Sequence, residues 1–135
     1  MTGEKDLATL IASMTPVLSE HEYVFGTLSE GNESLLTKLQ PIGTFHEQEG
    51  LTVIVLQSEA EKHHLHYHGL FKCITLNVHS SLAAVGLTAA VSTKLAQKNI
   101  SANVVAAYYH DHIFVPADDA ANALLCLQDL ARSYL

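Results

Sequence analysis

Residues 71–99 have the sequence FKCITLNVHSSLAAVGLTAAVSTKLAQKN, and this stretch carries the clearest pattern in the chain. Large apolar residues alternate with smaller or polar ones over Phe71–Val78, and a period of two is typical of a β-strand. Apolar residues then recur at intervals of three and four from Ala84 to Leu95, which is the spacing of a buried helix face. Ser80 or Ser81 can cap this helix. The stretch therefore predicts a strand followed by a helix.

The segment after this helix predicts a β-hairpin and a second helix. Ala102–Tyr109 is almost wholly apolar and suited to a strand, His110–His112 supplies a polar turn, and Ile113–Val115 returns as a second strand. Asp118 and Asp119 then suit the start of a helix, because negative charge is favourable at the positive end of the helix dipole. The second half is thus expected to run strand, helix, strand, strand, helix.

The first half echoes this order. Its expected elements are a leading helix over Leu7–Met14, a strand over Tyr23–Leu28, a short helix over Ser34–Leu39, an extended segment over Pro41–Glu47, a strand over Leu51–Leu56 and a brief helix over Ser58–His64. The extended segment and the strand that follows it are expected to pair through a turn at Gln48–Gly50. The topology is therefore expected to repeat, with one unit in each half of the chain.

Composition limits both the size of the protein and its partners. The chain has 135 residues, of which 48% are hydrophobic and 16% are charged. This composition supplies a packed core and excludes a disordered chain, and the length allows one compact domain or two very small ones. The formal net charge is -7 with histidine neutral. Nucleic acid is an unfavourable partner, because binding its phosphates requires clustered lysine and arginine.

The cysteines and the hydropathy pattern predict a cytoplasmic protein. Cys73 and Cys126 lie in apolar segments without the spacing of a metal site, so both are interpreted as small buried residues of a reducing compartment. The N-terminus lacks the basic start and the apolar centre of a secretory signal. No apolar run approaches the ~18–20 residues needed to cross a bilayer, so no membrane association is expected.

Several sequence features of the second half occur together in a known pattern. They are a strand that ends in the polar loop Val78–Ser81, a glycine at Gly86, a helix that carries Val91 and Leu95, and the strand entry Ile100–Val104. In these features the segment from Val78 to Tyr109 resembles the ACT domain, the small ligand-binding regulatory module of amino-acid-metabolism enzymes such as aspartokinases. The first half shares the element order and the strand entry Glu49–Val53. The whole chain resembles small bacterial tandem-ACT proteins.

The resemblance implies a fold and an assembly. The fold is an α+β protein of two tandem ferredoxin-like βαββαβ (ACT) units, with antiparallel sheets that carry their helices on one face. Residues 1–66 would form a degenerate N-terminal unit with its leading helix, and residues 67–135 would form the C-terminal unit. Exposed sheet edges favour a homodimer.

The loop between the first strand and the helix of the second half predicts a site for the charged end of a small molecule. Small residues there leave backbone N–H groups uncovered at the helix start, and these groups and the helix dipole attract a carboxylate. Ser80, Ser81 and Thr88 can add hydroxyl contacts, and Gly86 permits close approach of the backbone. The alternative is purely structural: Ser81 is only a helix cap and Gly86 only a packing contact.

The resemblance also implies a ligand and a function. The ligand would be an amino acid held by the loop Ser80–Thr88, including Val85 and Leu87. Asn103 and Val104 would join the site from a neighbouring strand. The chain would then be a non-enzymatic regulatory module without a cofactor, which acts in trans on a separate protein. A ligand-free interaction or assembly module is the alternative.

Histidines occur in two clusters, and imidazole is a common metal ligand. The first cluster comprises His63, His64, His66 and His68. In it His64 and His68 have the spacing of a helical pair, but Gly69 indicates a linker, so exposed solvating side chains are the preferred interpretation. In the second cluster His110 and His112 share one side of the predicted turn. A metal-binding protein or metal-dependent enzyme that uses these two histidines is the weaker alternative.

Catalytic motifs are missing from the sequence. It contains no nucleophile elbow, phosphate-binding loop, dinucleotide fingerprint or zinc-protease histidine pair. His79 and Ser80 are neighbours on a predicted strand end, where successive side chains point to opposite faces and rarely act as base and nucleophile. The sequence therefore disfavours an enzyme.

Overall fold

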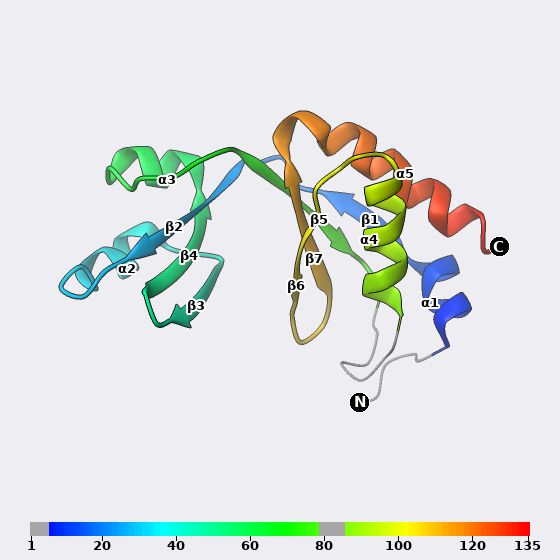
Figure 1. Cartoon of the computed structure of the whole chain (residues 1–135), viewed down its shortest axis with the longest axis horizontal. Coiled ribbons are helices and arrows are strands. Elements are labelled where there is room, and N and C mark those ends of the chain that lie inside the picture. Colours follow the sequence, from blue (N-terminus) through cyan, green and yellow to red (C-terminus); the bar gives the residue numbers. More distant parts are fainter. Residues whose placement is uncertain (1–5, 79–85) are drawn as a thin grey trace. The chain divides into compact units, whose positions relative to one another are not determined.

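The computed structural model describes residues 6–78 and 86–135, and these form two compact units (Figure 1). The smaller unit is His21–Phe71, and the larger unit combines residues 6–20 with 72–78 and 86–135. The sequence analysis expected a division after residue 66, with the leading helix in the N-terminal unit. The structure instead groups this helix with the C-terminal half.

The smaller unit contains strands and short helices in the predicted order. Its elements are β2 (Tyr23–Leu28), α2 (Ser34–Leu39), β3 (Gly43–Glu47), β4 (Gly50–Leu56) and α3 (Gln57–Lys62). Strands β2 and β3 each pair antiparallel with β4, which is therefore the central strand of the three. The predicted hairpin of β3 and β4 is confirmed, and the apolar character of β4 on both faces fits its central position.

One face of this sheet carries the core of the smaller unit. Val53 and Val55 of β4 are fully buried, and Val24 of β2 lies in the same cluster. Leu39 of α2 and Ala60 of α3 complete the contacts from the helices. Because successive strand residues point to opposite faces, both helices cover the same face of the sheet, as predicted.

The larger unit contains a second βαββαβ arrangement, of which one strand comes from early in the chain. Its elements are α1 (Leu7–Ser13), β1 (Pro16–Leu18), β5 (Phe71–Leu76), α4 (Leu87–Gln97), β6 (Asn103–Ala106), β7 (Asp111–Pro116), the 3-10 turn η1 (Ala117–Asp119) and α5 (Ala120–Arg132). The strand order is β1–β5–β7–β6, in which β1 is antiparallel to β5 and β6 is antiparallel to β7. The predicted α+β fold of tandem ferredoxin-like units is confirmed.

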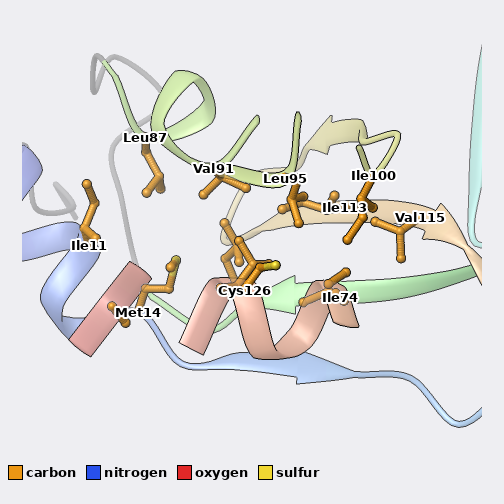
Figure 2. Close-up of a cluster of buried hydrophobic side chains, with 14 of the residues drawn as sticks. Ile11, Met14, Ile74, Leu87, Val91, Leu95, Ile100, Ile113, Val115 and Cys126 are labelled. Carbon is orange, nitrogen blue, oxygen red and sulfur yellow. The ribbon is translucent and has the colours of Figure 1, made fainter. Parts of the chain in front are cut away.

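A single hydrophobic cluster joins the elements of the larger unit (Figure 2). Its side chains point toward one another from the helices and strands, and they include Ile11, Met14, Ile74, Leu87, Val91, Leu95, Ile113, Val115 and Leu127. Fully burying one large apolar side chain stabilises a fold by about 1.5–3 kcal/mol. The apolar stripe that predicted the helix after β5 is thus the face of α4 that is buried.

Strand β1, which the sequence analysis did not predict, explains the division into units. Its pairing with β5 is extended on both sides, because the Asn77 N–H donates to the Thr15 carbonyl at 2.9 Å and the Ser19 N–H donates to the Cys73 carbonyl at 2.8 Å. The preceding helix α1 buries Ile11 completely in the cluster of the larger unit. Residues 6–20 therefore belong with β5 through both hydrogen bonds and packing.

The start of helix α4 differs from the prediction. The helix begins at Leu87, and Gly86 rather than Ser80 or Ser81 stands at its N-cap position. These two serines and Ala84 lie outside the described residues. Gly86, directly before the first helical residue, has a left-handed backbone with a φ of 100°, which glycine adopts readily.

The turn of the C-terminal hairpin also lies earlier than predicted. Ala106 pairs with Asp111 at the end of the ladder, and the Ala107 N–H donates to the His110 carbonyl at 3.1 Å. Asp111 and His112 are therefore residues of β7 rather than of the turn. His112 stands opposite Val105 of β6. The position of the His112 side chain is therefore set by the backbone of β7 rather than by a turn.

Both cysteines belong to the larger unit. Cys73 and Cys126 are both buried and unbridged, as the sequence predicts. Burial raises the pKa of the Cys73 thiol, with the hydrogen bond to Thr75 opposing it, so the thiol form is favoured.

Over the ranges 6–78 and 86–135, no helix is both long enough and apolar enough to span a membrane.

The assignment of α1 to the larger unit can be tested with Ile11→Ala. This change leaves a cavity in the cluster of the larger unit and should destabilise that unit by about 2–5 kcal/mol. Hydrogen exchange should then lose protection in α4, α5 and β7, while β2 and β4 keep theirs. Loss of protection centred on β2 and β4 would contradict the grouping of residues 6–20 with the C-terminal half.

Candidate functional site

The start of α4 is the described part of the predicted ligand loop. Gly86 has a φ of 100° and no side chain, so it cannot cap the N–H groups of the first helical turn. Leu87 is buried in the core, whereas Thr88 is exposed. Among the described residues, the N-cap residue Gly86 supplies no side-chain cap to this turn, and Thr88 lies on its exposed side. The other residues predicted for this loop lie outside the described residues: Ser80, Ser81 and Val85.

Gly86 is also required by the packing of the larger unit. A Cβ at this position would lie 2.9 Å from Leu7 Cδ2, which is closer than Cβ atoms normally approach. A side chain would have to displace Leu7 of α1 and would strain the positive φ. The glycine thus has a structural role whether or not the turn binds a ligand. Substitution of Gly86 would affect folding and ligand binding together.

Asn103 and Val104 lie at the start of β6, which stands at the end of the strand order of the larger unit. The Asn103 side-chain amide donates to the Phe114 carbonyl at 3.2 Å, and the residue is exposed. Val104 packs against the hydrophobic cluster. Both residues have contacts within the sheet, and Asn103 is the one that also presents a polar group to solvent.

In the smaller unit, the equivalent loop between β2 and α2 is occupied by its own carboxylate. The Gly31 N–H donates to both carboxylate oxygens of Glu33, at 3.1 and 3.3 Å. A ligand carboxylate would have to displace Glu33 to reach this donor. The sequence analysis did not identify this arrangement, although a glutamate two residues after a loop glycine is a visible signal for it.

A hollow of about 650 Å³ lies beside this loop. It is lined by the loop after β2 and by the turn between β3 and β4, which contribute His46 and the carboxylates Glu30, Glu33, Glu47 and Glu49. Carboxylates dominate this lining, so the local potential disfavours a free carboxylate and favours a cation. Pairing of β2 and β3 with β4 brings these residues together from separate parts of the sequence, which is why sequence spacing did not reveal them.

His112 contacts β5, and His110 contacts Val78, two residues after the end of that strand. His112 Nδ1 lies 2.9 Å from Thr75 Oγ1, and His110 Nδ1 lies 3.4 Å from the Val78 carbonyl oxygen. The structure thus engages one nitrogen of each ring within the larger unit. Throughout the described part of the chain, no group of three or more histidine, cysteine, aspartate or glutamate side chains could hold a metal ion.

The environment of His112 favours its neutral form. Burial, and after it the charge of His110, lower the pKa of His112, while the charge of Asp111 opposes this shift. Burial also raises the pKa of Asp111, with both histidine charges opposing it. The folded protein therefore takes up a proton at His112 less readily than the unfolded chain does, and stability is lost as the pH falls through the imidazole range.

Comparison with family models gives the same description for both halves of the chain. One ACT domain model matches residues 2–72, and another ACT domain model matches residues 71–129. The second match begins where the smaller unit ends, at Phe71. No curated protein sequence matches the chain.

Solved structures share the fold over most of the chain. A protein of unknown function from Vibrio cholerae, described as a possible transport protein, is 49% identical with a TM-score of 0.84, over 94% of this chain and 97% of that one. A protein from Agrobacterium tumefaciens is 16% identical with a TM-score of 0.72, over 87% and 89%. The ligand-free regulatory subunit of aspartate kinase from Thermus thermophilus is 9% identical with a TM-score of 0.65, over 87% and 96%. The last two identities support a shared fold alone.

The burial of His112 predicts a pH-dependent stability. Between pH 7 and pH 5.5 the wild type should lose stability more steeply than His112→Asn, because asparagine can keep a hydrogen bond to Thr75 and has no proton to take up. Urea unfolding at a series of pH values measures the two slopes. Burial raises the pKa of Asp111, so its titration acts on stability with the opposite sign and is common to both proteins. Equal slopes would contradict the prediction.

Proposed function

Since the chain belongs to the ACT domain family, we propose that it is a non-catalytic regulatory module that binds an amino acid and acts on a separate partner protein. ACT domains generally bind amino acids in regulatory roles. We assign the ligand to the larger unit, at the start of α4. Regulation requires that the amino acid bind two states of the protein with different affinities, because equal affinity would shift neither.

The observation that carries this proposal is that the N-cap position of α4 is held by Gly86, which makes no side-chain cap. Helix α4 has 11 residues, and Gly86 provides no side chain for its leading N–H groups. An α-carboxylate can accept hydrogen bonds from these groups, and the helix dipole adds to the attraction. The hydroxyl of Thr88 lies on the exposed side of the same turn. These groups supply what the charged end of an amino acid needs.

The remaining residues of the proposed site are assigned to the neighbourhood of this turn. We assign Ser80, Ser81 and Val85 to the loop that precedes it, as the family resemblance implies. Leu87 would contribute through its backbone, because its side chain is buried. From the neighbouring strand β6, we assign Asn103 as a polar contact and Val104 as an apolar neighbour, also by resemblance to the family.

The coverage of the similar structures supports action in trans. The matched region accounts for 96% of the Thermus regulatory subunit but only 34% of an aspartate kinase from Clostridium acetobutylicum. The similarity is therefore to a regulatory part that also exists as a separate chain.

A ligand-free assembly module is the second candidate function, because the edge of the larger sheet can form an assembly without a ligand. Val105 on β6 is 37% exposed, and Tyr108 and Tyr109 in the following turn are 69% and 60% exposed. An edge strand presents unpaired backbone groups beside these side chains. We therefore propose a homodimer through this edge in both cases, so that the two candidates differ in the ligand and not in the assembly.

A thermal-shift screen with the twenty amino acids tests the ligand. A ligand at about 100 times its dissociation constant should stabilise the protein by about 2.7 kcal/mol. Thr88→Val should reduce this shift, because it removes the hydroxyl and keeps the side-chain shape. Thr93→Val is the matched control, since Thr93 is exposed on the same helix. The absence of a shift with every amino acid would favour the assembly module, and an equal loss in Thr93→Val would refute the assigned site.

The two loops of the chain predict the stoichiometry of ligand binding. The Gly31 N–H already holds the Glu33 carboxylate, and the neighbouring hollow is acidic. Calorimetric titration with the amino acid found in the screen should therefore give one bound ligand per chain. Glu33→Gln should leave this ratio unchanged, because the other carboxylates remain. Two equivalent ligands per chain in the wild type would contradict the prediction.

A further inference from the structure

His66 and His68 form a close pair of imidazoles on the smaller unit. Their Nε2 atoms lie 3.2 Å apart, and their ring centroids lie 4.7 Å apart with the ring planes at 88°. Both residues are exposed, and both lie in the segment between α3 and β5. Sequence spacing had suggested His64 and His68 as a helical pair. The structure brings together instead two histidines that are two residues apart.

Tyr67 fixes the backbone between the two histidines. Its ring packs against the hydrophobic cluster of the smaller unit. Its hydroxyl donates to the Glu61 carboxylate and accepts a hydrogen bond from the Gln57 side-chain amide at 3.1 Å. Tyr67 is therefore fixed within the smaller unit by the packing of its ring and by two hydrogen bonds of its hydroxyl.

Leu65 holds the same segment one step earlier. It packs so closely over β2 that a Cβ at Gly26 would lie 2.7 Å from Leu65 Cδ2. Exposure alternates along this non-helical segment, with Leu65 and Tyr67 partly buried and His66 and His68 exposed. Both histidines thus project to the solvent side, and the residues next to them limit how far their backbones can separate.

The separation of the two Nε2 atoms suits one shared metal ion. Two imidazole nitrogens that bind a metal at about 2.0–2.1 Å are about 2.9 Å apart at a right angle and about 3.4 Å apart at the tetrahedral angle. The observed distance of 3.2 Å lies between these values. Exposed rings can turn to aim both nitrogens at one ion without moving the anchored backbone.

We propose that His66 and His68 chelate one divalent transition-metal ion of the Zn²⁺, Ni²⁺ and Cu²⁺ class through their Nε2 atoms. Imidazole suits these ions, whereas Mg²⁺ and Ca²⁺ prefer oxygen ligands. Among the described residues no third metal-ligating side chain joins the pair, so water takes the remaining positions. The site is independent of the amino-acid site proposed for the larger unit.

Metal binding replaces the hydrogen bond between the two rings. In the neutral pair one Nε2–H donates to the other Nε2, so one ring carries its proton on the nitrogen that the metal needs. That ring must lose the proton from Nε2 and gain one at Nδ1 through solvent, which leaves its charge unchanged. Both Nε2 lone pairs then face the ion. The exchange requires no other protein group.

Calorimetric titration of the tag-free full chain with Ni²⁺ tests the site. The wild type should bind one ion per chain, and His66→Asn and His68→Asn should each weaken binding by at least about tenfold. His64→Asn is the matched control, because His64 is an exposed neighbour with a φ of 58° that asparagine adopts readily. Its affinity should stay close to that of the wild type. Mg²⁺ should give no comparable binding.

Histidine ring signals in the NMR spectrum give a readout that needs no variant. Paramagnetic Ni²⁺ should broaden the ring protons of His66 and His68 first, and melting temperatures of the metal-free variants should match the wild type because both side chains are exposed. Unchanged affinity in His66→Asn or His68→Asn, or an equal loss in His64→Asn, would overturn the proposal. First broadening at His110 and His112 would also overturn it and would favour a metal site in the larger unit.

Tyr67→Phe tests the anchor separately from the ligands. The change removes the hydroxyl contacts with Glu61 and Gln57 and keeps both imidazoles. Binding of Ni²⁺ should weaken by less than in either histidine variant, because the rings lose their fixed spacing and not their lone pairs. Wild-type affinity in Tyr67→Phe would refute the anchoring role of Tyr67.

Discussion

The antiparallel pairing of β1 with β5 is the interaction on which the larger unit depends. Strand β5 lies between β1 and β7, so without β1 one side of its backbone would have no partner in the unit. Pro16 is suited to the first position of an edge strand, where its missing N–H removes no ladder hydrogen bond. The same segment brings α1 into place. Ile11 and Met14 then pack with the buried residues of α4 and α5, and Leu7 packs against Gly86 at the candidate site.

Much of the fold could be predicted from periodicity, because burial determines both the sequence pattern and the element. Leu87, Val91 and Leu95 illustrate this, since the spacing that predicted a helix also identified its buried face. Strand β1 could not be found in this way, because three residues that begin with proline show no measurable period. The expected boundary after residue 66 followed from the assumption that each unit consists of consecutive residues. The hydrogen bonds from the Ser19 N–H to the Cys73 carbonyl and from the Asn77 N–H to the Thr15 carbonyl show instead that residues 15–19 belong with β5.

The sequence could predict which residue types form the candidate site, but it could not predict their arrangement in space. A glycine near a helix start was visible in the sequence, while its positive φ and its contact with Leu7 depend on packing between segments far apart. The smaller unit shows the opposite case. There the carboxylate of Glu33 accepts a hydrogen bond from the N–H of Gly31 in its own loop. At the start of α4, by contrast, the N-cap residue Gly86 has no side chain that could act in this way. Topology places such a loop, and the adjacent side chains determine which charge it can accept.

The two pairs of histidines show why spacing alone does not predict imidazole chemistry. His110 and His112 are two residues apart, as are His66 and His68, yet the first pair has ring nitrogens engaged with Thr75 and the Val78 carbonyl. Burial also lowers the pKa of His112, so its neutral form is part of the folded structure.

In the segment between α3 and β5, by contrast, Leu65 and Tyr67 make the buried contacts. His66 and His68 remain exposed, and their Nε2 atoms face each other. The residues next to the histidines thus determine whether the imidazole nitrogens form contacts within the folded protein or remain accessible to a metal ion. A search for helical i, i+4 pairs overlooks this arrangement, because in an extended segment the side chains that share a face are two residues apart.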